Sequence, residues 1–292
     1  MIKLNFYKYR FIAFIFSSVV ILSSIFLFAK NNLNLGIDFK GGILIEANFS
    51  QKPDLSLLRN DLVTLSAGNI EIQEFGSPSN ILIRVEKNSD EEGEKEKLIN
   101  KIKNKLTGEI DYRRIEFVGP KVGKELQIMG IKAVLFSLVA MFIYIWFRFS
   151  GWQFGLGALV ALFHDVISTV GFFSLTQIEF NLASIAAILT IAGYSINDTV
   201  VVFDRIRENL TKDEMPFAEL LNLSISQTMS RTIMTSLTTM LALLALFIFG
   251  GEVVKGFVSA MIWGVLVGTY SSIFIASPLI VLLGFKKANQ SQ

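Results

Sequence analysis

An aspartate and an arginine, each inside a long apolar stretch, are the residues of this sequence best suited to chemistry. Asp198 follows Asn197 in the apolar half of "AGYSINDTVVVFDRIREN". Arg231 shares one helix face with hydroxyl side chains that recur every three or four residues, namely Ser224, Thr228, Thr235 and Thr238. A charge at the centre of a helix in lipid costs about 2.5–3.5 kcal/mol, and pairing Asp198 with Arg231 would remove much of that cost.

Such a pair can act as a proton switch. Burial favours the protonated form of a carboxyl group, whereas a nearby guanidinium favours its ionised form. Movement of Arg231 away from Asp198 would let the carboxylate take up a proton, and its return would expel one. The alternative interpretation is a static ion pair, or an Asp198 that only caps a helix or reaches towards the membrane surface.

A second pair of ionisable residues, His164 and Asp165, lies in the apolar segment "LFHDVIS". Asp165 can belong to a proton relay, or it can hydrogen-bond neighbouring helices and serve packing alone; the same alternatives hold for His164, Asn197 and Thr235. Consecutive helix residues point about 100° apart, so His164 and Asp165 need not touch. One histidine and no cysteine are too few ligands for a metal site, so neither a metal nor a cofactor is expected.

The apolar stretches themselves indicate a membrane protein. Hydrophobic residues make up 52% of the 292, charged residues only 18%. A bilayer-spanning helix needs about 20 apolar residues. The six candidate stretches are Phe11–Ala29, Ile128–Phe147, Phe154–Leu175, Asn181–Phe203, Ile233–Phe249 and Phe257–Leu283. The net charge of +2 gives no indication of a nucleic-acid partner.

The basic residues of the short connections predict the orientation of these spans. They concentrate at the N-terminus, after the second and fourth spans, and at the C-terminus. Both termini are therefore expected in the cytoplasm, with the region between the first two spans on the periplasmic side of the inner membrane. The first span lacks a convincing small-residue cleavage site and is interpreted as an uncleaved anchor. The expected parts are residues 1–29, a head domain at 30–127, and residues 128–292.

The charged region 30–127 predicts a small α+β domain. Alternating apolar residues indicate strands at 43–49, 70–72, 81–85 and 115–117, and apolar residues at helical spacing indicate helices at 55–65 and 98–106. The expected order βαββαβ is the ferredoxin-like split βαβ pattern. The expected fold is thus a six-helix transmembrane bundle with a ferredoxin-like periplasmic head.

Two sets of small residues predict shape rather than chemistry. In "NLGIDFKGGILIE", Gly36, Gly41 and Gly42 bracket Asp38 and precede a strand. A phosphate-binding loop opens a helix instead, so a rigid turn between the first span and the head is expected. Small residues four apart in the sixth span predict close helix packing, within the chain or with a partner: Gly256, Ala260, Gly264, Gly268 and Ser272.

Four segments, taken in order, resemble the SecF family, the smaller subunits of the bacterial SecDF protein-export complex: "LGIDFKGG", "VGPKVGKEL", "HD" and "GYSINDTVVVFDRIRENL". The resemblance extends over essentially the whole chain. It implies one six-helix repeat of the resistance–nodulation–division (RND) type and protein translocation assisted by the proton motive force. It implies that Asp198 and Arg231 are the proton-coupling pair. The implied partners are a separate SecD subunit, the SecYEG channel, YajC-type accessory proteins and an unfolded preprotein.

Two other classes of function stay open from the residues alone. A small-molecule exporter would need a second repeat and a substrate pocket, and a purely structural subunit would carry an inert Asp198. No nucleophile–base arrangement or metal cluster in the sequence indicates an enzyme. The acidic site alone would serve either H⁺ or Na⁺ as the coupling ion.

Overall fold

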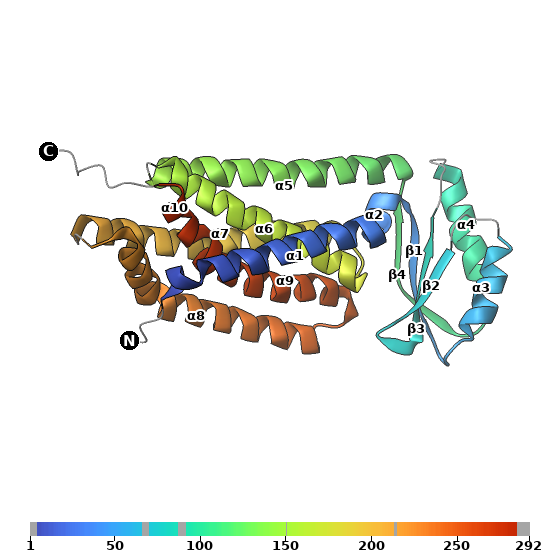
Figure 1. Cartoon of the computed structure of the whole chain (residues 1–292). Coiled ribbons are helices and arrows are strands. Elements are labelled where there is room, and N and C mark those ends of the chain that lie inside the picture. The colour runs from blue at the N-terminus through green and yellow to red at the C-terminus, as the bar shows by residue number, and fades with distance from the viewer. Residues whose placement is uncertain (1–4, 66–69, 87–91, 150, 213–214, 285–292) are drawn as a thin grey trace. The chain divides into compact units, whose positions relative to one another are not determined.

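The computed structural model describes residues 5–65, 70–86, 92–149, 151–212 and 215–284 (Figure 1). The chain divides into two compact units. The helical unit comprises Met1–Asn34, Ala133–Ile178 and Ala183–Gln292, and the head unit comprises Leu35–Lys132 together with the separate segment Glu179–Leu182. That segment connects α6 (Trp152–Thr176) and α7 (Leu182–Lys212). The expected division of the chain placed it in the membrane part, residues 128–292, whereas in the structure it belongs to the head unit.

Among the described residues, six helices are long and apolar enough to span a membrane. They are α1 (Arg10–Asn31, after the 3₁₀ turn Phe6–Tyr9), α5 (Pro120–Phe149), α6 (Trp152–Thr176), α7 (Leu182–Lys212), α8 (Phe217–Phe249), and α9 (Glu252–Ser271) with its continuation. The continuation is a π-helical turn (Ser272–Ala276) followed by α10 (Ser277–Leu282). The prediction of six apolar helices is confirmed.

Most of the helices are longer than their predicted spans, and two differences are the most pronounced. α8 begins at Phe217, well before the predicted start at Ile233, because hydropathy detects only the part of a helix that needs lipid. The sixth span is interrupted by the π-helical turn just before Pro278. Proline has no backbone N–H and crowds the preceding turn, which disturbs regular α-helical hydrogen bonding there.

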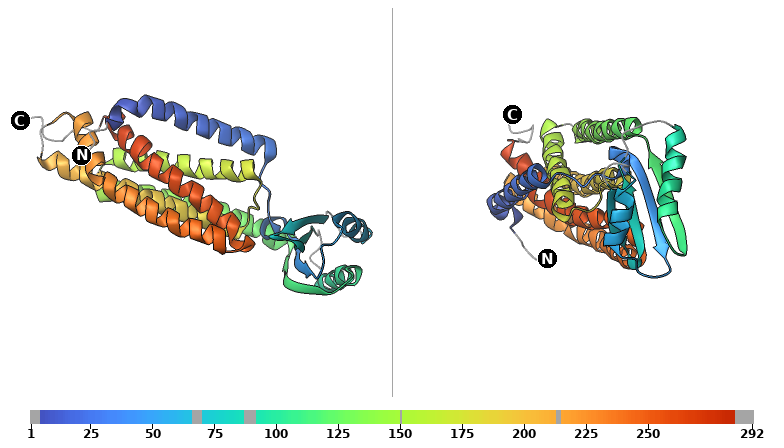
Figure 2. Two further views of the ribbon diagram at one scale, coloured as in Figure 1. Left: turned by 90° about the horizontal axis from the view of Figure 1, so that it is seen from below. Right: turned by 90° about the vertical axis from the view of Figure 1, so that its right-hand side faces the viewer.

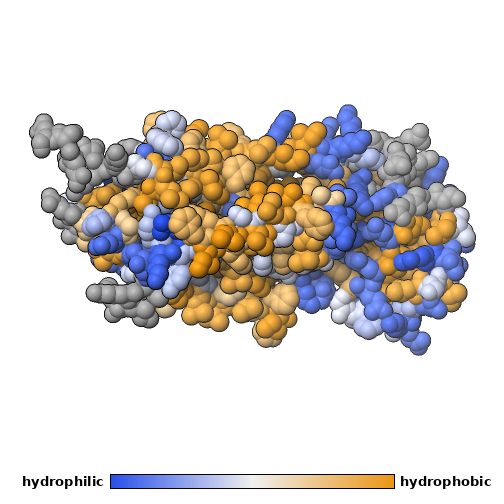
Figure 3. Space-filling model, viewed as in Figure 1, coloured by the Kyte–Doolittle hydropathy of each residue, from blue (hydrophilic) through white to orange (hydrophobic). Residues whose placement is uncertain are grey.

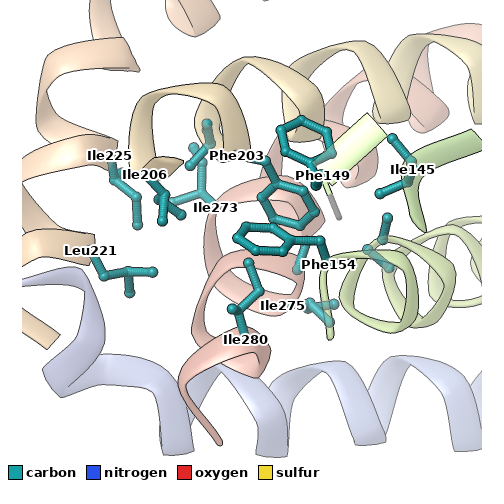
Figure 4. Close-up of a cluster of buried hydrophobic side chains, with 14 of the residues drawn as sticks. Ile145, Phe149, Phe154, Phe203, Ile206, Leu221, Ile225, Ile273, Ile275 and Ile280 are labelled. Atoms are coloured by element: carbon teal, nitrogen blue, oxygen red, sulfur yellow. The ribbon is translucent and has the colours of Figure 1, made fainter. Parts of the chain in front are cut away.

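The helical unit has an aromatic core where α5, α6 and α7 meet. Phe149 stacks on Phe154 with ring centroids 5.4 Å apart, and Phe203 meets them edge-on at 5.6 and 5.1 Å (Figure 4). Aliphatic side chains surround these rings, among them Ile145, Ile206, Leu221, Ile225, Ile273, Ile275 and Ile280. Lipid is as apolar as these side chains, so close van der Waals packing holds them together rather than transfer out of water.

The face of the helical unit seen in Figure 3 is largely apolar as well. On α1, large side chains such as Phe11, Ile12 and Ile15 are more than half exposed. Exposed apolar surface on this scale is typical of helices in contact with lipid or with another membrane protein.

The small residues of α9 allow close contact with α7 of the same chain. A Cβ at Gly264 would overlap the Ile191 side chain, and a Cβ at Gly268 would lie 3.1 Å from that of Ser195. Ala260 is fully buried on the same helix. At these positions the neighbouring helix therefore belongs to this chain and not to a partner.

Replacing Gly264 with alanine should destabilise the helical unit. The added methyl group overlaps Ile191, and overpacking of a well-packed core costs about 1–3 kcal/mol. Gly193→Ala on α7 is the matched control, because nothing lies within 4 Å of a Cβ there. Thermal unfolding in detergent is the measurement, and an unchanged transition in Gly264→Ala would contradict this packing.

The head unit is a four-stranded antiparallel sheet with two helices on one face (Figure 2). Its elements are α2 (Ile37–Lys40), β1 (Gly42–Phe49), α3 (Leu55–Val63), β2 (Ile70–Phe75), β3 (Ser77–Val85), α4 (Glu92–Lys105) and β4 (Ile110–Val118). The spatial order is β2-β3-β1-β4. Ile45 and Ile83 of the central strands pack on Leu62 of α3 and Ile102 of α4. Only Gly76 separates β2 from β3, so these two strands are joined by a tight turn.

Candidate functional site

Asp165 lies where α6, α7 and α9 meet, and its side chain is completely buried. Its Oδ2 accepts a hydrogen bond from Ser195 Oγ of α7 at 2.6 Å and another from Ser271 Oγ of α9 at 2.7 Å. Gly268 makes this arrangement possible, because its missing side chain lets α9 approach Ser195. One carboxylate thus ties three membrane helices together.

His164 contacts Asp165 directly. Its Nδ1 lies 3.0 Å from Asp165 Oδ1, although adjacent helix residues point in different directions. The other ring nitrogen, Nε2, is buried and has no hydrogen-bond partner in the described structure. The Tyr270 ring lies 6.0 Å from the His164 ring, and its hydroxyl donates to Ala13 O of α1 at 2.8 Å. The polar cluster around Asp165 therefore extends from α6 towards α1.

Asp198 lies one helical turn beyond Ser195 on α7 and is also buried. Its Oδ2 has no hydrogen-bond partner among the described residues. Arg231 of α8 is exposed, and no ion pair joins it to Asp198 in the described part of the chain. The two residues are separate in this conformation, not in the contact that their polarity suggested.

The other predicted polar residues are not part of the Asp165 cluster. Asn197 is exposed on α7, and the Thr235 hydroxyl donates to the Arg231 carbonyl of its own helix at 3.0 Å. Sequence reasoning missed Ser195 and Ser271, which donate to Asp165. Their signals were present: Ser195 stands three residues before Asp198, and Ser271 stands beside a residue of the small-residue series in the sixth span.

The glycine turn connects α1 to the head sheet. Gly41 and Gly42 have φ of +78° and +131°, which side-chain-bearing residues rarely adopt. A Cβ at Gly41 would also lie 2.8 Å from the Pro120 backbone at the start of α5. Asp38 does more than shape this turn, because its Oδ2 accepts the backbone N–H of Leu182, the first residue of α7, at 2.9 Å.

Two family models match the chain. The one described as "Protein export membrane protein SecD/SecF, C-terminal" matches residues 98–286, and the "SecD/SecF GG Motif" matches residues 26–53. A protein named "Protein translocase subunit SecF" from Rickettsia rickettsii (strain Sheila Smith) is 44% identical over 99% of this chain and 94% of its own length. The protein of the same name from Rickettsia bellii (strain OSU 85-389) is 45% identical over 98% of this chain and 95% of its own length.

The structure is similar to crystal structures of SecDF. That of SecDF from Thermus thermophilus, described as a translocon-associated membrane protein, superposes with a TM-score of 0.83 at 36% identity. SecDF in a super-membrane-facing form superposes with a TM-score of 0.69 at the same identity. The match covers 96% of this chain but only 38% of either solved chain.

Proposed function

Since this chain belongs to the SecD/SecF family of protein export membrane proteins, we propose that it couples the proton motive force to preprotein translocation, with Asp198 and Arg231 as the switching pair. Its general role is in protein export, as a multi-pass protein of the inner membrane. The proposal goes further, because it assigns the energy source and the residues that respond to it.

The state of Asp198 carries this proposal. A buried carboxylate oxygen without a hydrogen-bond partner is costly when charged, so the separated arrangement of Asp198 and Arg231 suits a protonated carboxyl group. Approach of Arg231 would favour release of that proton. Because Ser195 lies one turn away and holds Asp165, a shift of α7 at Asp198 would also strain the contact among α6, α7 and α9.

The available energy is adequate for a switch of this kind. One elementary charge crossing 100 mV yields about 2.3 kcal/mol, and about 1.4 kcal/mol changes an equilibrium tenfold. One proton therefore biases a two-state equilibrium by more than tenfold. A large conformational change would require several protons, or an ATP-driven motor elsewhere in the export machinery.

The helical unit offers faces suited to a membrane partner. Exposed small or polar residues recur on α7 at every third or fourth position: Ala183, Ala186, Thr190, Gly193 and Asn197. On α8 the same spacing gives the exposed residues Arg231, Thr238, Ala242 and Ala245, together with the half-buried Thr235. Small residues favour close helix approach, and a charged or amide side chain seldom faces lipid alone. The proposed occupant is a SecD subunit, which would supply the part of SecDF that this chain does not match.

The finer architecture belongs to the same proposal. The strand order β2-β3-β1-β4 with helices after β1 and β3 supports a ferredoxin-like head. The six apolar helices would form one RND-type repeat, with both termini cytoplasmic and the head periplasmic. There the head would meet a preprotein emerging from the SecYEG channel.

Export from cells that depend on this chain tests the energy source. Release of a secreted protein is followed after addition of a proton uncoupler or, separately, a sodium ionophore. The uncoupler should slow release to the rate of cells that lack the chain, and the ionophore should not. A response to the sodium ionophore alone would refute proton coupling, and a response to neither would favour a structural subunit.

A further inference from the structure

The connection between α6 and α7 is held against the head unit by main-chain contacts. The Phe180 carbonyl accepts a hydrogen bond from the Gly36 N–H at 2.9 Å, and Phe180 forms a parallel bridge with Leu35. The Phe180 ring lies 5.8 Å from the Phe39 ring and is buried. Phe180 thus packs on the glycine turn that leads into the head sheet.

The neighbouring residue, Glu179, adds a polar contact. Its carboxylate accepts a hydrogen bond from Nη2 of Arg84 on β3 and forms an ion pair with it. The Arg84 side chain is only 7% exposed and has a second carboxylate partner, Glu71, at 3.4 Å. A Cβ at Gly36 would overlap the Glu179 carboxylate, so a glycine is needed where Glu179 lies.

The first residue of α7 is attached as well. The Asp38 carboxylate accepts the Leu182 N–H, a group that has no partner within its own helix. A carboxylate at this position also interacts favourably with the positive end of the helix dipole. The backbone, an aromatic ring, a partly buried ion pair and a helix cap therefore all fasten Glu179–Leu182 to the head.

We propose that Glu179–Leu182 is a permanent clamp through which displacement of α7 is passed to the head. α7 carries both Ser195 and Asp198, so a shift at the switch would reach the head through Leu182 without having to pass through α1 or α5. Arg84, Glu179 and Asp38 are then positioning residues for translocation. This inference rests on the proposed function, which supplies the displacement.

Glu179 contributes an acceptor oxygen for Arg84 to the clamp. Burial raises the pKa of Glu179 above its ordinary value, although Arg84 opposes the shift. The pH-dependent part of its contribution to stability is therefore largest in acid and falls as the pH rises through the raised pKa. Glu179→Gln, which keeps an acceptor oxygen for Arg84, should hold the clamp at neutral pH. Glu179→Lys places a second cation against Arg84 and should open it.

A disulfide can replace these contacts in this chain, which has no cysteine of its own. The bridge partners Leu35 and Phe180 should have Cα atoms roughly 5 Å apart, within the range of about 4.4–6.8 Å that a disulfide accepts. The variants are Leu35→Cys with Phe180→Cys, alone and combined with Glu179→Lys. Phe180→Cys alone and Glu179→Gln are the controls. Export is measured under oxidising and reducing conditions at matched accumulation.

We expect Glu179→Lys to lose the uncoupler-sensitive part of export and Glu179→Gln to keep it. In the variant that combines the two cysteines with Glu179→Lys, disulfide formation should restore the uncoupler-sensitive part of export. The variant with the two cysteines alone should stay fully active when it is oxidised. The clamp is refuted if oxidation of the variant with the two cysteines alone blocks export and reduction restores it. Export would then require Glu179–Leu182 to separate from the head, which a permanent clamp does not allow. It is equally refuted if Glu179→Lys exports normally. Failure of the proposed function looks different, because export would then ignore the uncoupler in every variant, oxidised or reduced.

Discussion

Asp198→Asn should abolish the gradient-driven part of export while the chain still folds and enters the membrane. Asparagine has nearly the same shape and is neutral at every pH, so the variant is fixed in a state that resembles protonated Asp198. Arg231 then has no carboxylate to approach. Export should fall to the rate of cells that lack the chain and should no longer respond to an uncoupler.

The matched control for this variant is Asp204→Asn on the same helix. Asp204 is partly exposed and pairs with Arg148 at 2.8 Å, and surface ion pairs contribute only about 0–1 kcal/mol. Export by Asp204→Asn should remain sensitive to the uncoupler. If Asp198→Asn also exports normally at equal accumulation, Asp198 is inert and the chain acts as a structural subunit.

Asp165→Leu should reduce the amount of folded protein more than any other single change at the polar cluster. It removes the acceptor for Ser195 and Ser271 and leaves His164 Nδ1 without its partner. Each buried polar group left without a partner costs about 1–3 kcal/mol. Asp165→Asn keeps one acceptor oxygen and should accumulate much better than the leucine variant.

Membrane accumulation and unfolding in detergent measure this difference. Wild-type accumulation of Asp165→Leu would show that the cluster contributes little to the fold. Export by Asp165→Asn separates the two roles considered for Asp165. Near-normal, gradient-sensitive export indicates packing, whereas a folded variant without gradient response indicates a relay group.

The membrane part was largely predictable because lipid imposes a simple rule on sequence. Apolar stretches of sufficient length predicted all six helices. Polarity within them made Asp165, Asp198 and Arg231 the candidates for the site, and their role stays a prediction. In the head, apolar alternation gave the order of strands and helices. Each of these patterns lies within one short segment of the chain, so it can be recognised without knowing which segments meet in the fold.

The parts that could not be predicted depend on residues far apart in the chain. Serine is common in membrane helices, and Ser195 and Ser271 gain meaning only when α7 and α9 meet at Asp165. The clamp is similar, because Glu179 and Arg84 are 95 residues apart and nothing local in "TQIEF" indicates a head contact. The separation of Asp198 and Arg231 reflects one conformation, whereas polarity suggested only that the two belong together.

Infrared spectroscopy of the purified, membrane-reconstituted complex tests most directly whether Asp198 gains and loses a proton. A protonated carboxyl group absorbs separately from a carboxylate, so spectra recorded across a pH titration report on both forms. If Asp198 is the switch, a carboxylic-acid band should disappear on the alkaline side in the wild type and should be missing from Asp198→Asn. The same band with the same pH dependence in both proteins would contradict the proton switch at this residue.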